Sequence, residues 1–159
     1  MRFIADEMLG KLSRWLRMAG FDVAYRRQIP DEDLLEAARA ESRVLLTRDT
    51  RLIQRCDPEQ SLFIGHDLLA DQLQEFFQRF PELKSQVVPL SRCVECNALL
   101  RPIAKEEIRE KVWPYVYQHQ ERFTTCPDCH RVYWEATHVA KIREKLHQLI
   151  FDSEETFPL

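Results

Sequence analysis

Cys93-Val-Glu-Cys96 and Cys126-Pro-Asp-Cys129 hold four of the five cysteines in this 159-residue chain. Each Cys-x-x-Cys segment can direct two thiolates at one ion, and two such segments complete a tetrahedral shell. Four sulfur ligands leave no position for water, so we predict structural rather than catalytic zinc. The alternatives are a disulfide framework and a thioredoxin-type redox motif. The redox motif requires a helix start after a strand, whereas polar residues, Asn97 and His130, follow the two segments here.

The cysteine segments also predict how the chain divides into domains. Residues 1–88 are numerous enough to bury an ordinary hydrophobic core. Residues 89–159 approach the size at which a bound metal helps to fix the fold. We therefore predict a first domain at 1–88 and a zinc ribbon domain with a C-terminal helix at 89–159.

Apolar periodicity in the first domain predicts alternating strands and helices. This order favours an α/β fold with a small parallel sheet and helices on both of its faces. Ligands of such sheets bind at the carboxyl ends of the strands. The expected strands are Arg2–Ala5, Phe21–Tyr25, Arg43–Thr47 and Ser61–Gly65, and the expected helices are Met8–Ala19, a helix opened by Pro30 and Asp31, and Asp67–Phe80.

The second predicted domain has a different pattern. We expect a short helix near Lys105–Val112, an aromatic stretch from Trp113 to Phe123 and a ribbon strand at Arg131–Trp134. A terminal helix is expected to place Val139, Ile142, Leu146, Leu149 and Ile150 on one face, and residues 152–159 are expected to form a frayed tail.

Charge and composition limit the classes of partner. The net charge is −3, with 13 Lys plus Arg against 15 Asp plus Glu in residues 1–90 and 10 against 11 in residues 91–159. A polyanion must therefore be held by a local basic patch. No apolar run approaches the roughly 20 residues that span a bilayer, so we expect a soluble, cytoplasmic protein with no membrane partner. Free thiols suit that reducing compartment.

Two carboxylates follow predicted strands. Asp6 comes directly after the first strand, and Asp49 comes two residues after the third, so both are expected at the same edge of the sheet. Such a pair can hold Mg²⁺ or Mn²⁺ with retained waters beside a phosphate. The alternative for both is an ordinary loop carboxylate, and Asp31 and Asp67 are explained equally well as helix N-caps.

Basic residues are expected close to these carboxylates. Lys11, Arg14 and Arg17 lie off the apolar stripe of the first helix, and Arg48 and Arg51 flank Asp49. Arginine suits phosphate recognition because it donates two parallel hydrogen bonds. A solvated helix face is the alternative explanation.

Several segments are informative in combination. They are Asp6-Glu-Met-Leu-Gly-Lys-Leu-Ser-Arg-Trp-Leu-Arg17, Asp31-Glu-Asp-Leu34, Leu46-Thr-Arg-Asp49, Arg92-Cys-Val-Glu-Cys-Asn97, Cys126-Pro-Asp-Cys-His-Arg-Val-Tyr-Trp134 and Thr137-His138. Taken together, these segments resemble the Mut-seven C-terminal RNase family, a PIN-like nuclease domain fused to a zinc ribbon. The resemblance extends to about residue 150, and it is the combination of segments that is specific.

The resemblance implies a PIN-like three-layer α/β/α sandwich and a metal-dependent ribonuclease acting on RNA. It implies Mg or Mn ligation by Asp6, Asp31 and Asp49, with Asp33 and Asp67 as weaker candidates. The phosphate contacts would then come from Lys11, Arg14, Arg17 and Arg48, and the zinc ligands would be Cys93, Cys96, Cys126 and Cys129.

The chain departs from the family pattern at three places: Ser13 stands where alanine is expected, Glu135-Ala136 stands where glycine is usual, and the third place is His130. His130 follows the second cysteine segment where glycine is expected. A non-glycine residue with positive φ carries local strain, so we expect the loop after Cys129 to be shaped differently.

Two other functions remain open. In the first, the chain is a non-catalytic RNA- or ribosome-binding module whose zinc ribbon docks RNA, a ribosome or a protein partner. In the second, it is a phosphoacceptor receiver domain, which requires a lysine at a later strand end. The first lysine after Asp49 is Lys84, beyond the last helix of the sheet domain, which disfavours this reading.

Overall fold

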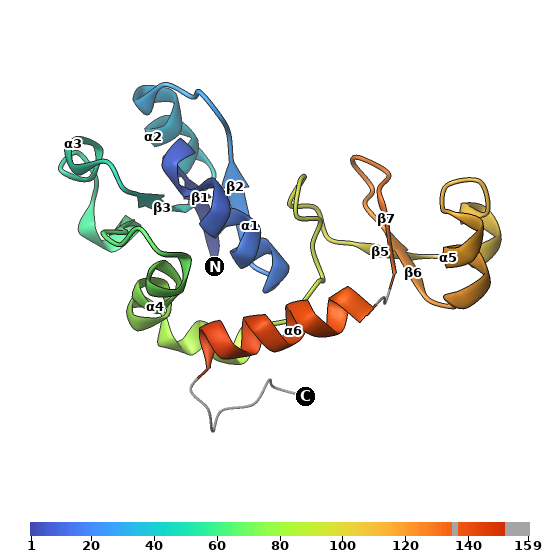
Figure 1. Cartoon of the computed structure of the whole chain (residues 1–159). Helices are drawn as coiled ribbons and strands as arrows, with labels where there is room; N and C mark the ends of the chain where they lie inside the picture. Colours follow the sequence, from blue (N-terminus) through green and yellow to red (C-terminus); the bar gives the residue numbers. More distant parts are fainter. Residues whose placement is uncertain (135–136, 152–159) are drawn as a thin grey trace.

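Four parallel strands form the centre of the N-terminal part of the molecule (Figure 1). They are β1 (Arg2–Ala5), β2 (Asp22–Tyr25), β3 (Val44–Thr47) and β4 (Ser61–Phe63), in the order β2-β1-β3-β4. The computed structural model describes residues 1–134 and 137–151. The predicted tail at 152–159 lies outside these residues.

Helices cover both faces of the sheet. One face carries α1 (Gly10–Met18), entered through the 3-10 turn η1 (Glu7–Leu9), and α4 (Leu69–Arg79). The other face carries α2 (Asp31–Ala40) and the short α3 (Thr50–Ile53). Strand alternation explains the division, because Phe3 and Ala5 join the first core and Ile4 joins the second. The predicted three-layer α/β arrangement is therefore confirmed.

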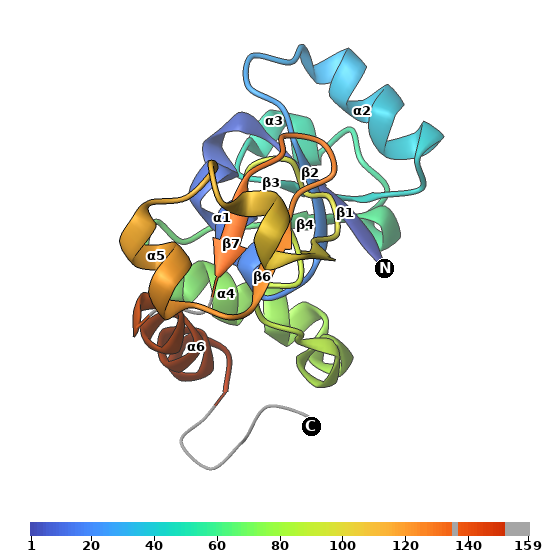
Figure 2. The same cartoon turned by 90° about the vertical axis from the view of Figure 1, so that its right-hand side faces the viewer.

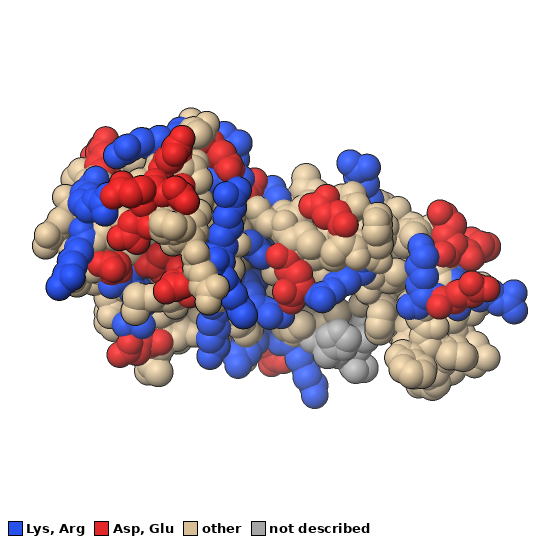
Figure 3. All heavy atoms as spheres, turned by 90° about the horizontal axis from the view of Figure 1, so that it is seen from above, with Lys and Arg blue, Asp and Glu red and all other residues tan. Residues whose placement is uncertain are grey.

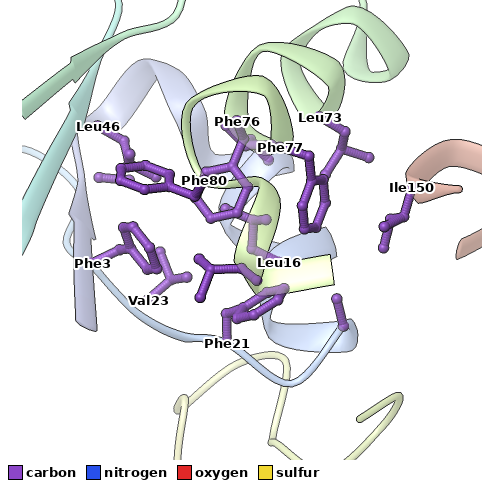
Figure 4. Close-up of a cluster of buried hydrophobic side chains, with 14 of the residues drawn as sticks. Phe3, Leu16, Phe21, Val23, Leu46, Leu73, Phe76, Phe77, Phe80 and Ile150 are labelled. Carbon is purple, nitrogen blue, oxygen red and sulfur yellow. The ribbon is translucent and has the colours of Figure 1, made fainter. Parts of the chain in front are cut away.

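Phenylalanine dominates the larger core (Figure 4). The ring of Phe3 in β1 contacts the ring of Phe76 in α4, with centroids 5.0 Å apart. It also contacts the ring of Phe80, the residue just after α4, with centroids 5.4 Å apart. Phe76 also meets Phe77 edge to face at 5.1 Å. Edge contacts of this kind add to the stabilisation from burial alone, so α4 is fixed firmly against the sheet. The 3-10 turn η2 (Pro58–Gln60) precedes β4, and the 3-10 turn η3 (Pro81–Gln86) follows α4.

The C-terminal part contains a separate antiparallel sheet. Its strands are β5 (Arg101–Ile103), β6 (Phe123–Thr125) and β7 (Val132–Trp134), in that order. Pro102 lies in β5, an edge strand, where a missing N–H costs no ladder hydrogen bond. Between β5 and β6 lie the 3-10 turn η4 (Lys105–Ile108) and α5 (Pro114–His119).

The terminal helix α6 (Thr137–Ile150) returns from the ribbon to the first sheet (Figures 1 and 2). Leu146, Ile150 and Phe151 belong to the same buried cluster as Phe3. Lys145 places its ammonium 5.6 Å from the ring centre of Trp15 in α1. The helix therefore completes the core of the first part, although the predicted boundary assigns it to the second. The division at residue 88 stays a prediction.

Several predicted elements differ in detail. The residues that precede α2 and α4 are Pro30 and Leu68, so neither Asp31 nor Asp67 is an N-cap. The helix expected at Lys105–Val112 is only the short turn η4. The helices α3 and α5 and the strands β5 and β6 were not expected. Among the described residues, no helix has the length and apolar character needed to cross a bilayer.

Candidate functional site

The four cysteines of the two segments converge on one point. Their sulfur atoms all lie within 4.8 Å of one another, and Cys93 Sγ is 3.7 Å from Cys129 Sγ. Zn–S bonds of about 2.3 Å in a tetrahedron require sulfur separations of about 3.8 Å. The donor set and its spacing therefore fit a structural metal such as zinc. Within residues 1–134 and 137–151 this is the only cluster of three or more potential ligands that is so close.

Each cysteine segment is followed by a residue with left-handed backbone. Asn97 has φ 69° and His130 has φ 58°. The N–H of Asn97 donates to Cys93 O, and the N–H of His130 donates to Cys126 O at 3.0 Å. His130 thus has the positive φ on which the expectation about its loop was based, and a loop shape different from the family pattern stays a prediction. Histidine is among the non-glycine residues that adopt this conformation more readily than most.

Hydrogen bonds prepare Cys93 to act as a thiolate ligand. Burial raises its pKa, but the Tyr133 hydroxyl and the backbone N–H groups of Cys96 and Glu95 outweigh burial and lower the pKa to about 7. The Tyr133 oxygen lies 3.1 Å from Cys93 Sγ. A thiolate is the form that binds zinc, so β7 supplies a supporting contact to the first segment.

Arg17 joins the first cysteine segment to the sheet. The residue is only 5% exposed, and its Nε donates to Val23 O of β2 at 2.8 Å. Its Nη1 donates to Val94 O at 3.0 Å and to Glu95 O at 2.8 Å. The guanidinium is therefore turned toward the cysteine segment and away from solvent.

Asn97 binds the open edge of β2. Its side-chain oxygen accepts from the N–H of Val23 at 3.0 Å, and its side-chain nitrogen donates to Asp22 Oδ1 at 2.7 Å. Arg43 approaches the same Asp22 oxygen at 2.6 Å. Arg92 donates to Gly20 O at 3.1 Å. Sequence reasoning missed this role of Asn97 because a long-range contact leaves no local pattern.

Asp6 lies at the carboxyl end of β1 and is 6% exposed. Its Oδ1 accepts from the N–H of Met8 at 2.8 Å, which caps η1. Its Oδ2 accepts from the hydroxyl of Thr47 and, at 2.8 Å, from the N–H of Arg48. A carboxylate offers about four lone pairs, so these three donors leave one for another ligand.

Asp49 follows β3 and caps α3. Its Oδ1 accepts from the N–H groups of Arg51 at 2.7 Å and Leu52 at 3.0 Å, and these bonds lower the pKa of the carboxyl. Its Oδ2 accepts no hydrogen bond from the described residues. The hydroxyl oxygen of Thr47 accepts from the N–H of Asp49 at 2.9 Å and also donates to Asp6. Thr47, which sequence reasoning did not select, thus links the two carboxylate-bearing loops.

The other acidic candidates lie farther out. Asp31 is exposed in the first turn of α2, with Arg55 at 3.7 Å. Asp33 is exposed in the same turn, and Asp67 is exposed after β4, where it accepts from Arg48. The three predicted ligands Asp6, Asp31 and Asp49 do not form a cluster as close as that of the cysteines.

The predicted phosphate-binding cations differ in exposure. Lys11 and Arg14 are exposed on α1, and the Arg48 side chain is 22% exposed at the carboxyl edge. Arg14 forms an ion pair with Glu95 of the ribbon at 2.8 Å. Figure 3 shows Asp and Glu gathered on the N-terminal part, with a band of Lys and Arg along the flank that faces the ribbon. Arg17, the fourth predicted cation, is buried and so does not belong to this exposed band.

Two hollows of the surface lie away from the acidic loops. One is lined by residues such as Arg2, Val44 and Phe80, and the other by residues such as Leu35 and Gln60. These residues surround the amino ends of the strands. Neither of these two hollows is lined by Asp6, Asp31 or Asp49.

Comparison with known proteins identifies the family. A family model described as the Mut7-C RNAse domain matches residues 1–146, nearly the whole chain. Searches of curated proteins and of solved structures found no match. The match includes the sheet, the acidic loops, both cysteine segments and most of α6, so it agrees with the resemblance seen in the sequence. The chain therefore belongs to the Mut7-C RNAse domain family.

Proposed function

We propose that this protein is a metal-dependent, PIN-like ribonuclease that hydrolyses RNA phosphodiester bonds at the carboxyl edge of its parallel sheet. Family membership supports ribonuclease activity. The observation that carries the metal dependence is the link made by Thr47, which holds the loops of Asp6 and Asp49 together at adjacent strand ends. Magnesium is commonly bound by one or two carboxylates and several waters, so two ligands are sufficient.

Asp6 and Asp49 would hold the Mg²⁺ or Mn²⁺ ion directly. Asp6 has one lone pair left, and Asp49 Oδ2 is available because Oδ1 alone makes the cap. Asp31 is exposed at the start of α2 and would contribute through water. When bound, such an ion polarises the phosphoryl oxygen and lowers the pKa of an attacking water.

The basic residues would bind the phosphates that flank the cleaved bond. Arg48 lies between the acidic loops and Asp67, and Lys11 is exposed on the helix that follows Asp6. Arg14 would first have to leave its ion pair with Glu95. Arg17 is omitted from this role because its donors serve β2 and the ribbon.

The ribbon would bind substrate or a partner, and the cysteines would hold structural zinc. Free thiols and the absence of an apolar span in the sequence support our prediction of a cytoplasmic location.

Asp49→Asn is the sharpest test of this site. Asparagine keeps the capping oxygen that binds Arg51 and Leu52 and replaces only the free oxygen with NH₂, so the fold is retained. We expect Mg²⁺- or Mn²⁺-dependent cleavage of single-stranded RNA to fall by about 100-fold or more. Asp57→Asn is the matched control, because Asp57 caps η2 at the opposite edge of the sheet.

Equal cleavage by the wild type and Asp49→Asn would refute the metal site. The alternative function, a non-catalytic RNA- or ribosome-binding module, is favoured by one observation: three protein donors already occupy Asp6. That alternative predicts RNA binding without cleavage at any concentration of Mg²⁺ or Mn²⁺.

A further inference from the structure

Two aromatic side chains of the ribbon project into solvent. Trp113 is 79% exposed, the highest value among the large apolar residues that the structure describes, and Tyr115 is 68% exposed. Neither belongs to a described hydrophobic cluster. The fold therefore does not use these rings for core packing, although burying such a side chain would stabilise it substantially.

The ring of Tyr115 and the backbone at Trp113 are nevertheless held in place. Trp113 directly precedes α5, whose first residue is Pro114, a residue that fixes the backbone at a helix start. The Tyr115 ring stacks on His119 one helical turn later, with centroids 4.1 Å apart and planes inclined by 26°. His119 Nδ1 also lies 2.8 Å from Tyr115 O. One face of Tyr115 is thus supported by the protein, and its high exposure leaves the other face accessible.

The charges around this helix favour a polyanion. Lys105 forms an ion pair with Glu121 at 2.7 Å and lies over the Tyr117 ring at 5.3 Å. Glu107 accepts from the N–H of Ala104 at 3.4 Å. Four cations of the surrounding segments are exposed and form no ion pair with described residues, against three such acidic residues. The cations are Arg101, Arg109, Lys111 and Arg122, and the acidic residues are Glu106, Glu107 and Glu110.

The position of α5 suits an accessory binding surface. The helix lies at the end of the ribbon farthest from the first sheet (Figure 1), and Figure 2 shows it in front of the other elements. At that end, uncharged side chains form a projecting surface beside charged ones (Figure 3). A ligand that reaches from the acidic loops to α5 must be long.

We propose that Trp113 and Tyr115 form a stacking surface for the bases of single-stranded RNA, the substrate class of the proposed ribonuclease. This inference rests on the proposed function for the identity of its ligand. Exposed aromatic rings next to unpaired cations are the combination that binds single strands without sequence preference, because every base has a face that stacks. The ribbon would then hold one part of the RNA while another part reaches Asp49.

Binding of a 15-nucleotide oligouridylate, measured by fluorescence anisotropy without added Mg²⁺ or Mn²⁺, tests the proposal. The double variant Trp113→Ala, Tyr115→Ala should raise the Kd by about fivefold or more for each stacked base lost. Trp113→Phe, Tyr115→Phe should bind within about threefold of the wild type, because phenylalanine keeps the stacking face. Leu99→Ala, which removes another exposed apolar residue of the ribbon, is the matched control and should bind normally.

Tryptophan emission gives a second readout. RNA should quench the wild type more strongly than Trp113→Phe, which retains only Trp15 and Trp134. An unchanged Kd in the double alanine variant would overturn the proposal. So would a ribbon surface that captures a protein but not RNA. Because the binding assay has no cleavage step, a protein that binds through Trp113 but never cleaves RNA would refute the proposed function and leave this inference standing.

Discussion

Replacing the buried Arg17 with methionine should destabilise the protein by about 3 kcal/mol. The guanidinium makes three hydrogen bonds to carbonyl oxygens of β2 and the first cysteine segment. A hydrogen bond from a charged group contributes about 1.5–3 kcal/mol. Val94 O and Glu95 O share the nitrogen Nη1, so we count two independent bonds at the lower value of that range. Methionine keeps the apolar stem and the helix propensity, so the loss of unfolding free energy measures the contribution of the hydrogen bonds.

Arg14→Met is the matched control for this change. Arg14 lies on the same helix and also contacts residue 95, but it does so through a single ion pair with the Glu95 side chain. Its side chain is 54% exposed, and exposed pairs contribute about 0.5 kcal/mol. The two variants remove the same charge from the same helix, so their difference isolates the buried bonds.

Thermal unfolding of the zinc-loaded proteins, followed by circular dichroism, measures the difference. At roughly 2–4 °C for each kcal/mol in a chain of this size, Arg17→Met should lower the Tm by about 6–12 °C. Arg14→Met should lower it by about 2 °C or less, and 1 M NaCl should remove that smaller effect. Equal Tm values for the two variants would show that the ribbon contributes nothing to the stability of the sheet through Arg17.

The remaining predictions concern a carboxylate, a glycine and the metal. Burial raises the pKa of Asp22, but hydrogen bonds from Arg43 and Asn97 outweigh it and lower the pKa below its ordinary value. The ionised form therefore stabilises the fold at pH 7, and the advantage of the wild type over Asp22→Asn in urea unfolding should be constant above about pH 5 and shrink below about pH 4. Gly20→Ala should cost about 3 kcal/mol in the same assay, because φ is 102° and the new Cβ would lie 2.7 Å from Val88 O. Removing the metal with a chelator should lower the calorimetric Tm by more than Arg17→Met does, and added zinc should restore it.

The layers of the fold could be predicted because local patterns specify them. Period-two alternation around Ile4 and the apolar stripe of α1 both describe faces that must be buried. The short elements could not be predicted in the same way. The four residues of α3 carry too little periodicity, and its real signal was Asp49, an N-cap that was considered only as a metal ligand or an ordinary loop carboxylate. The strands β5 and β6 contain three residues each, which is too short for alternation to be visible.

The candidate site could be predicted only in part. Strand ends place Asp6 and Asp49 at one edge, as expected from sequence order. The sequence could not show that both carboxylates also cap turns, because capping depends on where η1 and α3 begin. It also could not show that Arg17 is buried. Arg17 lies beside the apolar stripe of α1, and a charged residue in that place is expected to face solvent. Its guanidinium is covered by the ribbon, and the sequence of α1 contains no sign of that contact.

One strand connects the ribbon to the acidic edge. The ribbon holds β2 at Val23 through Asn97 and Arg17, and two residues later the Tyr25 hydroxyl donates to Glu7 O at 3.0 Å. Glu7 is the neighbour of Asp6 in sequence, so the position of β2 constrains the turn that the Asp6 carboxylate caps. A metal at the cysteines would take no part in chemistry, because its four sulfur ligands leave no open position. It would nevertheless fix the segment that holds β2, and so a structural metal would support the turn that the Asp6 carboxylate caps.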